Sequence, residues 1–157
     1  MSLKIIHTAD WHLGQTFFGY DRDEEHEAFL SWLIDILTLR QTDVLLIAGD
    51  VFDVANPSAA AQRRFFRFLR EANRRNPQLQ IVIIAGNHDS AARLEAPIPL
   101  LEELNTSIVG AVPRTDLCKI DFDSLLIPLY NKEGKREAIC LACLLYTSDA
   151  ADERSSV

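Results

Sequence analysis

Three short apolar runs recur along the chain, and each one ends abruptly in polar residues. They are Leu3–His7, Asp43–Ala48 and Gln80–Ala85, and Gly49 and Gly86 follow the last two. Short, nearly continuous runs rich in β-branched residues are typical of strands buried on both faces of a parallel sheet. The glycines mark sharp exits, because glycine adopts backbone conformations that other residues avoid. The pattern therefore predicts three central strands.

Between these runs the apolar positions change to helical spacing. A first helix is predicted over residues 23–39, with acidic side chains clustered in its first turn. A second is predicted to begin at Asn56, as the N-cap, with Pro57 in the first helical position, and to end near Arg75. A third, shorter helix is predicted over residues 92–104, with two prolines close to its start.

The predicted elements alternate between strand and helix. Residues 107–109 and 117–120 are candidates for further strands. Such alternation indicates an α/β fold, with a mainly parallel sheet flanked by helices and right-handed crossovers. In open α/β sheets, ligands bind outside the carboxyl ends of the strands. We therefore expect the functional residues at that edge.

Polar clusters follow all three predicted strands. Residues 10–12 read Asp-Trp-His, residues 49–53 read Gly-Asp-Val-Phe-Asp, and residues 86–89 read Gly-Asn-His-Asp. Carboxylate, imidazole and amide oxygen groups are the ligands that hard or borderline divalent metals prefer. Because the three clusters fall at one edge of one sheet, the sequence predicts a metal site there.

A two-metal phosphoester site requires a carboxylate that bridges two cations roughly 3.5–4 Å apart. Asp50, on the middle loop, suits the bridging position. Asp10 and His12 are spaced to reach one ion, and Asn87 offers its amide oxygen to the other. His88 stands next to Asn87 and is placed to meet a substrate.

Each cluster also has a purely structural interpretation. An Asp-x-His pair is common in solvated loops, and the Asp of a Gly-Asp pair often caps a helix. The Gly-Asn-His-Asp segment fits a tight turn with a left-handed Asn and an Asp that caps the next helix. We keep this structural interpretation for Asp53 and Asp89. Three such clusters at successive strand ends favour the metal site for the others.

These motifs resemble the opening motifs of the calcineurin-like metallophosphoesterase superfamily. The surrounding segments HTADWHLGQ (7–15), AGDVFDVANPS (48–58) and AGNHDSAARL (85–94) closely resemble the bacterial SbcD-type DNA nuclease family within it. The resemblance covers approximately residues 1–130. It implies four ligands for two divalent cations, Mn²⁺ or alternatively Mg²⁺: Asp10, His12, Asp50 and Asn87. It implies that Asp50 bridges the ions and that catalytic His88 assists departure of the leaving oxygen.

The resemblance also implies a substrate and partners. Members of this family cleave phosphodiester bonds at double-stranded DNA ends, as exonuclease and endonuclease, with a metal-activated water. They act in a DNA repair complex with an SbcC-type coiled-coil ATPase. They form homodimers through helices that correspond here to residues 57–75 and 92–104. The side of the second helix that carries Phe65, Phe66 and Leu69 is then the candidate dimer face.

Composition limits these expectations without deciding among them. The net charge of −7 argues against a generally basic nucleic-acid binder, but bound divalent cations can invert the local field. The second predicted helix nevertheless carries six arginines, interpreted either as a solvated face or as a basic stripe near DNA phosphates. No apolar run approaches the roughly 20 residues that span a bilayer, and no leader is evident. We therefore expect no membrane association and a cytoplasmic location.

The later part of the chain departs from the superfamily pattern. That pattern includes three further histidines, whereas no histidine follows His88 here. Residues 143–153 resemble a translated transposon-end adapter of the kind used in preparing sequencing libraries. We therefore expect residues 1–142 to be the N-terminal part of the nuclease domain, the first half only. Residues 143–157 would then be a non-native tail, and the chain would be inactive alone.

Two other functions remain open from the sequence. One is a different calcineurin-like phosphatase or phosphodiesterase. The other is a non-catalytic interaction module with an incomplete metal site. The five expected site residues speak against the second alternative, because a decayed site has little reason to keep all of them.

Overall fold

The computed structural model describes residues 2–101, 104–114 and 120–144. Its central sheet contains β1 (Ile5–Thr8), β4 (Val44–Ala48), β5 (Gln80–Ile84) and β6 (Thr106–Val109). All neighbours in this sheet pair in parallel, in the order β1-β4-β5-β6. The three predicted strands and the further strand near residue 107 are thereby confirmed, as is the α/β fold class.

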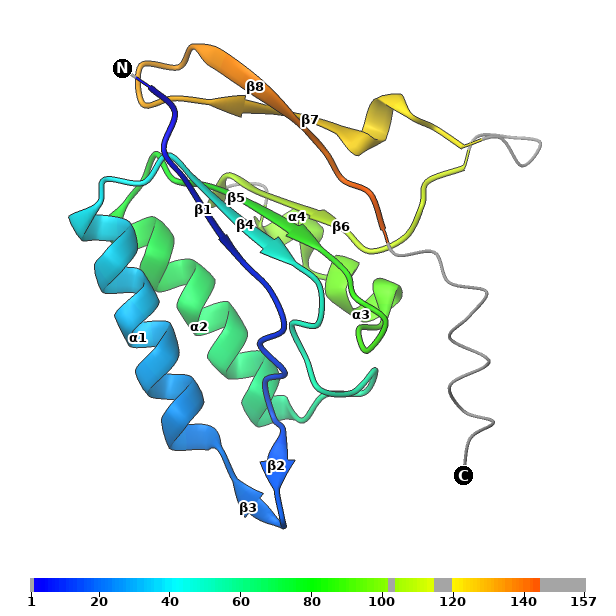
Figure 1. The fold of residues 1–157 in the computed structure, drawn as a ribbon. Helices are drawn as coiled ribbons and strands as arrows, with labels where there is room; N and C mark the ends of the chain where they lie inside the picture. Colours follow the sequence, from blue (N-terminus) through cyan, green and yellow to red (C-terminus); the bar gives the residue numbers. More distant parts are fainter. Residues whose placement is uncertain (1, 102–103, 115–119, 145–157) are drawn as a thin grey trace.

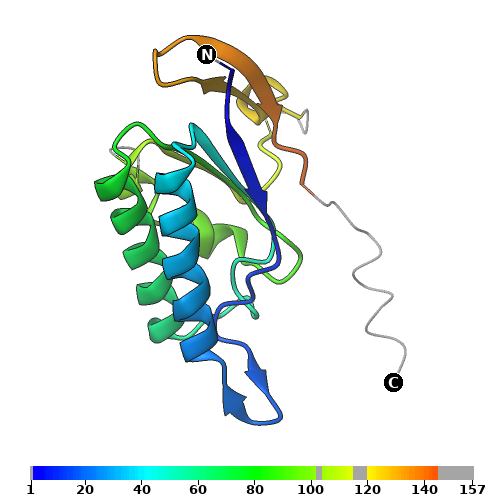
Figure 2. The ribbon, with the colours of Figure 1, turned by 60° about the vertical axis from the view of Figure 1, so that its left-hand side comes forward.

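Two long helices cover one face of the sheet, α1 (Asp23–Leu39) and α2 (Ala59–Arg75). They lie side by side in both views (Figures 1 and 2). Right-handed crossovers that always advance in the same direction must place their helices on the same face. The largest core forms between these helices and the side chains of β4 and β5 that point toward them, such as Leu45 and Ile81.

The first helix has the predicted bounds, but the second begins later than predicted. Its N-cap is Ser58, in an extended conformation, and the Ser58 hydroxyl accepts the backbone N–H of Ala61 at 3.1 Å. The prediction of Asn56 as the cap was therefore wrong. Pro57 stands before the cap, where its fixed φ suits extended backbone as well as it suits a first helical turn.

The single helix predicted over residues 92–104 was also wrong. The structure has two short helices instead, α3 (Ala91–Glu95) and α4 (Ile98–Leu101). Pro97 separates them, because proline has no N–H to continue the hydrogen-bond ladder. Both short helices contact β6.

The second face of the sheet packs against an antiparallel pair that was not predicted, β7 (Leu126–Tyr130) and β8 (Arg136–Leu141). This pair lies on the side of the sheet opposite the helices (Figures 1 and 2). Leu125, Ile127 and Leu129 form a second buried cluster there with Val44 and Val82. A 3-10 turn at Asp123–Leu125 leads into β7. The architecture is thus a sandwich with the central sheet in its middle.

A second unpredicted pair, β2 (Thr16–Phe17) and β3 (Tyr20–Asp21), forms a small hairpin beyond β1. It projects from the end of the molecule at which α1 begins (Figure 1). The ring of Phe18, at its tip, is 87% exposed. The segment was missed because its strands have only two residues each, too few to show a period.

Burial overturns the face that was predicted for dimerisation. Phe65 and Leu69 are fully buried within the chain's own core, and only Phe66 remains partly exposed. Trp11 and Leu13 are buried beneath the loop that carries Asp10 and His12, and Trp11 contacts Phe29, Phe65 and Phe68 edge-on. The aromatic side of α2 therefore supports the site loops from below.

Two predictions fall on parts of the chain that the structure does not describe. Most of the possible strand at residues 117–120 lies outside the described residues, although Ile120 forms an isolated bridge with Arg114. Residues 145–157, nearly all of the predicted tail, also lie outside them. None of the helices in the described part is long and apolar enough to cross a membrane.

Candidate metal centre

Three loops meet at the carboxyl edge of the central sheet. They are the β1 loop (residues 9–15), the β4 loop (residues 49–58) and the β5 loop (residues 85–90) (Figure 1). The β1 and β4 loops continue the strand pairing past the strand ends. The N–H groups of Asp10, His12 and Leu13 donate to the carbonyls of Gly49, Asp50 and Val51 at 3.1, 3.0 and 3.0 Å.

The three expected ligands on the first two loops share a strained backbone. Asp10, His12 and Asp50 have φ values of 56°, 45° and 48°, in the left-handed region. This region is unfavourable for residues with a Cβ, and such strain concentrates at functional sites. Outside the site, the described non-glycine residues with a positive φ, Phe18, Gln41 and Asn105, stand singly in separate connections, whereas these three gather in two adjoining loops. The backbone therefore points to a function at this edge.

The side chains of these residues converge. One possible ligand atom from each of Asp10, His12 and Asp50 lies within 4.8 Å of the others. Nε2 of His12 is 4.0 Å from Oδ2 of Asp50, whose side chain is largely buried. Two carboxylates and an imidazole around one point form a donor set suited to a hard or borderline divalent cation.

A second group of possible ligands adjoins the first through His12. It consists of His12, Asp53 and His88, again with ligand atoms within 4.8 Å of one another. Nδ1 of His12 lies 3.4 Å from Oδ1 of Asp53, and the rings of His12 and His88 are 5.1 Å apart, edge to face. Asp53, which was expected to be purely structural, therefore belongs to the site.

A further observation favours a metal ion at these two groups. Among the described residues, Nδ1 of His12 is a buried nitrogen that makes no hydrogen bond, and its 3.4 Å contact with Oδ1 of Asp53 is an ion pair only if the ring is protonated. A buried polar atom without a hydrogen bond is costly, and a bound cation is one way to satisfy it. The structure thus offers two groups of three side chains that are able to hold divalent metal.

A hydrogen bond of His88 determines which of its ring nitrogens carries a proton. Its Nδ1 lies 2.8 Å from the carbonyl oxygen of Asp53, which can only accept, so Nδ1 carries a proton. This hydrogen bond raises the pKa of His88 above its ordinary value; nearby Asp50, Asp53 and Asp89 raise it further, while partial burial opposes them. His88 is therefore biased toward the protonated ring, with Nε2 left free of the Asp53 contact.

Asp89 has a different role from the helix cap that was predicted. The residue at the N-cap of α3 is Ser90. The carboxylate of Asp89 instead accepts the N–H groups of Val51, Phe52 and Gly86 at 3.0–3.1 Å. Burial raises its pKa, and these three hydrogen bonds oppose that shift. No local pattern in the sequence indicates a contact between positions 38 residues apart.

Asn87 lies in the β5 loop directly before His88, and its side chain is exposed. Its φ is not positive, so the left-handed turn of the alternative, purely structural interpretation does not occur at this position. The structure thus brings Asp10, His12, Asp50 and His88 together, and it places Asn87 on the adjoining loop.

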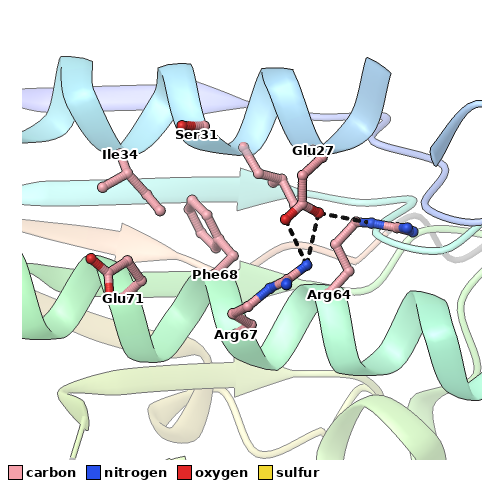
Figure 3. Close-up of a pocket in the computed structure, with 8 residues that line it drawn as sticks. Glu27, Ser31, Ile34, Arg64, Arg67, Phe68 and Glu71 are labelled. Carbon is pink, nitrogen blue, oxygen red and sulfur yellow. Dashed lines mark hydrogen bonds and ion pairs between the residues drawn. The ribbon is translucent and has the colours of Figure 1, made fainter. Parts of the chain in front are cut away.

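The arginines of α2 belong to a separate region. Four of the six form ion pairs: Arg64 with Asp23 and Glu27, Arg67 with Glu27, Arg74 with Glu71, and Arg75 with Asp35. Figure 3 shows Arg64 and Arg67 converging on the Glu27 carboxylate in a pocket of about 170 Å³ between α1 and α2. Most of the apparent basic stripe is therefore neutralised by acidic side chains, chiefly those of α1. Arg63 and Arg70 make no ion pair among the described residues.

Several known bacterial proteins are similar to this chain over most of its length. The chain is 49% identical over 140 residues to the D subunit of the nuclease SbcCD from Rhodobacter capsulatus, with 89% of this chain and 34% of that protein covered. It is 38% identical over 133 residues to the corresponding protein of Escherichia coli, covering 76% of this chain and 33% of that protein. It is 36% identical over 148 residues to that of Bacillus subtilis, covering 94% and 35%.

The chain spans about a third of the length of these curated relatives. The family model for calcineurin-like phosphoesterases matches residues 3–140, a range that includes all three site loops. With the parallel sheet, the converging ligand groups and this match, the chain belongs to the calcineurin-like phosphoesterase family.

Proposed function

We propose that the chain contributes the front part of a two-metal phosphodiesterase centre that acts on DNA ends. The observation that carries this proposal is the convergence of Asp10, His12 and Asp50, all three in strained left-handed backbone, at one edge of the sheet. The names of the relatives, which are nuclease subunits, support DNA as the substrate. Asp10, His12, Asp50 and Asn87 are the proposed metal ligands, with Asp50 between two ions.

When bound, divalent cations polarise a phosphoryl oxygen and lower the pKa of an attached water. Asp50 would hold both ions, because it stands on the middle loop, and the N–H of His88 orients its carboxylate by donating to Oδ1 at 2.9 Å. His88 keeps a proton on Nδ1 against the Asp53 carbonyl, so Nε2 is the atom that meets the substrate. A protonated Nε2 can donate to the leaving oxygen, which fits the raised pKa of His88.

Manganese is the proposed metal, with magnesium as the alternative, because the carboxylate and amide oxygen donors of the proposed ligands suit both ions. The test is electron paramagnetic resonance of free Mn²⁺ during titration into the 157-residue chain. Asp50→Asn should weaken binding at least tenfold, since it removes a charge from the centre. Asp121→Asn, at a turn outside the three site loops, is the matched control. Equal affinity of all three proteins would exclude the proposed centre.

The complete enzyme is proposed to require more residues than this chain contains. We propose that residues 1–142 form the N-terminal part of the nuclease domain and that residues 143–157 are adapter-derived. The nucleotide sequence of the gene tests the tail: codons 143–153 that differ from the adapter exclude that origin. The isolated chain is expected to show little or no cleavage of duplex ends with Mn²⁺. Robust cleavage that His88→Ala abolishes would contradict this expectation.

The proposed partners are an SbcC-type ATPase, a second copy of the chain and double-stranded DNA. The term SbcCD in the names of the relatives supports the ATPase. For the second copy, the proposed face is the exposed side of α2 around Phe66, Arg63 and Arg70, which forms a shallow groove. Phe66→Glu should convert a dimer to a monomer in sedimentation velocity. A wild-type chain that is monomeric at all concentrations would exclude this face.

A further inference from the structure

Asp89 is the one acidic residue of the site loops whose carboxylate is used entirely for contacts with backbone groups. Its Oδ2 accepts the N–H of Val51 at 3.1 Å and that of Gly86 at 3.0 Å, and Oδ1 accepts the N–H of Phe52 at 3.0 Å. Val51 and Phe52 belong to the β4 loop, whereas Gly86 opens the β5 loop. The carboxylate therefore ties two loops that no strand pairing holds together at this level.

Asp50 makes the reverse connection. It stands on the β4 loop, and its Oδ1 accepts the N–H of His88 on the β5 loop at 2.9 Å. Each loop thus supplies a carboxylate to the backbone of the other. Hydrogen bonds from backbone N–H groups to an ionised carboxylate are shorter and stronger than those to neutral acceptors. Together the two carboxylates fix the distance between Asp50 and His88.

No other acceptor competes with Asp89 for the backbone N–H groups that it binds. Within the described part of the chain, the N–H groups of Val51, Phe52 and Gly86 donate only to its carboxylate. Gly86 also lies so close to Asp50 that a Cβ added there would be 2.7 Å from Cγ of Asp50. The loops are in contact, and Asp89 supplies the link between them that engages backbone N–H groups of both loops, beside the Asp50–His88 and His88–Asp53 hydrogen bonds.

We propose that Asp89 is a positioning residue of the metal centre, which sets Asp50 against His88 without binding metal itself. Its importance for metal binding rests on the proposed function, whereas its effect on the two loops does not. Loss of the Asp89 carboxylate should therefore disturb the Asp50–His88 contact even in the metal-free protein.

The test is amide hydrogen exchange, measured by nuclear magnetic resonance in Asp89→Asn and in the wild-type chain without metal. The variant keeps the size of the side chain but replaces one acceptor oxygen with a donor. The amide of His88 should exchange at least tenfold faster in the variant, although its own acceptor, Asp50, is unchanged. Asp121→Asn is the matched control, because Asp121 also accepts a backbone N–H, that of Ser124. An unchanged exchange rate at His88 in Asp89→Asn would overturn the proposal.

A second measurement decides the matter if Asp89→Asn does not fold. In the wild-type chain the amides of Val51, Phe52 and Gly86 should be protected from exchange, as strand amides are, although all three lie in loops. Exchange of these amides at unprotected rates would overturn the proposal.

Mn²⁺ titration separates this inference from the proposed function. Where the wild-type chain binds Mn²⁺, Asp89→Asn should raise the dissociation constant at least tenfold and Asp121→Asn should not. A variant that binds Mn²⁺ as tightly as the wild type would overturn the positioning role. A wild-type chain that binds no Mn²⁺ would count against the proposed function, and the exchange measurements would still decide the role of Asp89.

Discussion

Gly86 occupies a position where the space, not the backbone conformation, requires glycine. Its φ is outside the left-handed region, but a Cβ there would collide with the backbone nitrogen and the carboxylate of Asp50. Overpacking of this kind costs about 1–3 kcal/mol. Gly86→Ala should therefore lower the free energy of unfolding in urea by that amount, and it should also displace Asp50 and weaken Mn²⁺ binding.

Gly134→Ala is the control for Gly86→Ala. Gly134 has a φ of +73° and nothing within 4 Å of an added Cβ, so its substitution should cost only about 1–2 kcal/mol of backbone strain. Mn²⁺ binding should be unaffected in that variant. If Gly86→Ala binds Mn²⁺ as the wild type does, the close approach of Gly86 to Asp50 has no consequence for the site.

His26 makes the stability of the chain depend on pH. It is buried on α1, and burial lowers the pKa of its ring, with Arg22 and Arg64 adding to the effect against the opposing charges of Asp23 and Glu25. The folded state therefore resists protonation more than the unfolded state. The contribution of neutral His26 to the free energy of unfolding is fully present above the ordinary histidine pKa of about 6.5. That contribution is lost as the pH falls below this value.

The measurement for His26 is urea unfolding at about pH 7.5 and about pH 5.5, on either side of the ordinary histidine pKa. The wild-type chain should lose more stability between these conditions than His26→Gln, which has no proton to take up. The other three histidines are common to both proteins and cancel in the difference. Equal losses in the two proteins would show that His26 does not resist protonation.

At the residue scale the sequence predicted which groups would meet but not how they are held. Asp10, His12, Asp50 and His88 were predicted correctly to converge, because parallel strands end at one edge and each loop is short. Asp53 and Asp89 were misjudged. Apart from the bond between Asp89 and the N–H of Gly86, which lies three residues away, their contacts lie 35 to 41 residues away along the chain. No local pattern indicates such a hydrogen bond between two loops.

The start of α2 provides a test at the scale of one element. Ser58 accepts the N–H of Ala61, and loss of such an N-cap costs about 1 kcal/mol. Ser58→Ala should therefore lower the free energy of unfolding by about 1 kcal/mol, measured in urea. Asn56→Ala should change it by less than about 0.5 kcal/mol, as is typical of surface positions. A larger effect at Asn56 would restore the cap that the sequence suggested.

Long elements were predictable, whereas short ones were not. The apolar positions of α1 repeat over 17 residues, and the predicted bounds were confirmed. Strands β4 and β5 are buried on both faces, so their runs stand out even at five residues each. The hairpin of β2 and β3 depends on turn geometry, and the short helices on either side of Pro97 contact β6. A periodic pattern contains neither feature.

Gln80 connects the central sheet to the β7–β8 pair on its second face and so affects the molecule as a whole. Its Nε2 donates to the carbonyl of Pro128 at 2.9 Å, and its Oε1 accepts the N–H of Tyr130 at 3.3 Å. Gln80 is buried, so Gln80→Ala leaves backbone groups of β7 unsatisfied, at a cost of about 1–3 kcal/mol.

The measurement is urea unfolding combined with hydrogen exchange of the β7 amides. Gln80→Ala should lower stability and speed exchange in β7 while β4 remains protected. Gln78→Ala is the control, because Gln78 is exposed and makes only a 3.4 Å contact with the carbonyl of Lys132. If the two substitutions behave alike, Gln80 does not join the layers.

The strands of the central sheet stand in space in the order in which they occur along the chain. During synthesis, each strand of this sheet after β1 is therefore translated after the neighbour with which it pairs. The site loops end at residue 90, ahead of β6, β7 and β8. Every loop that contributes to the candidate metal centre is thus translated before the last strand of the described sheet and before the β7–β8 pair that covers its second face.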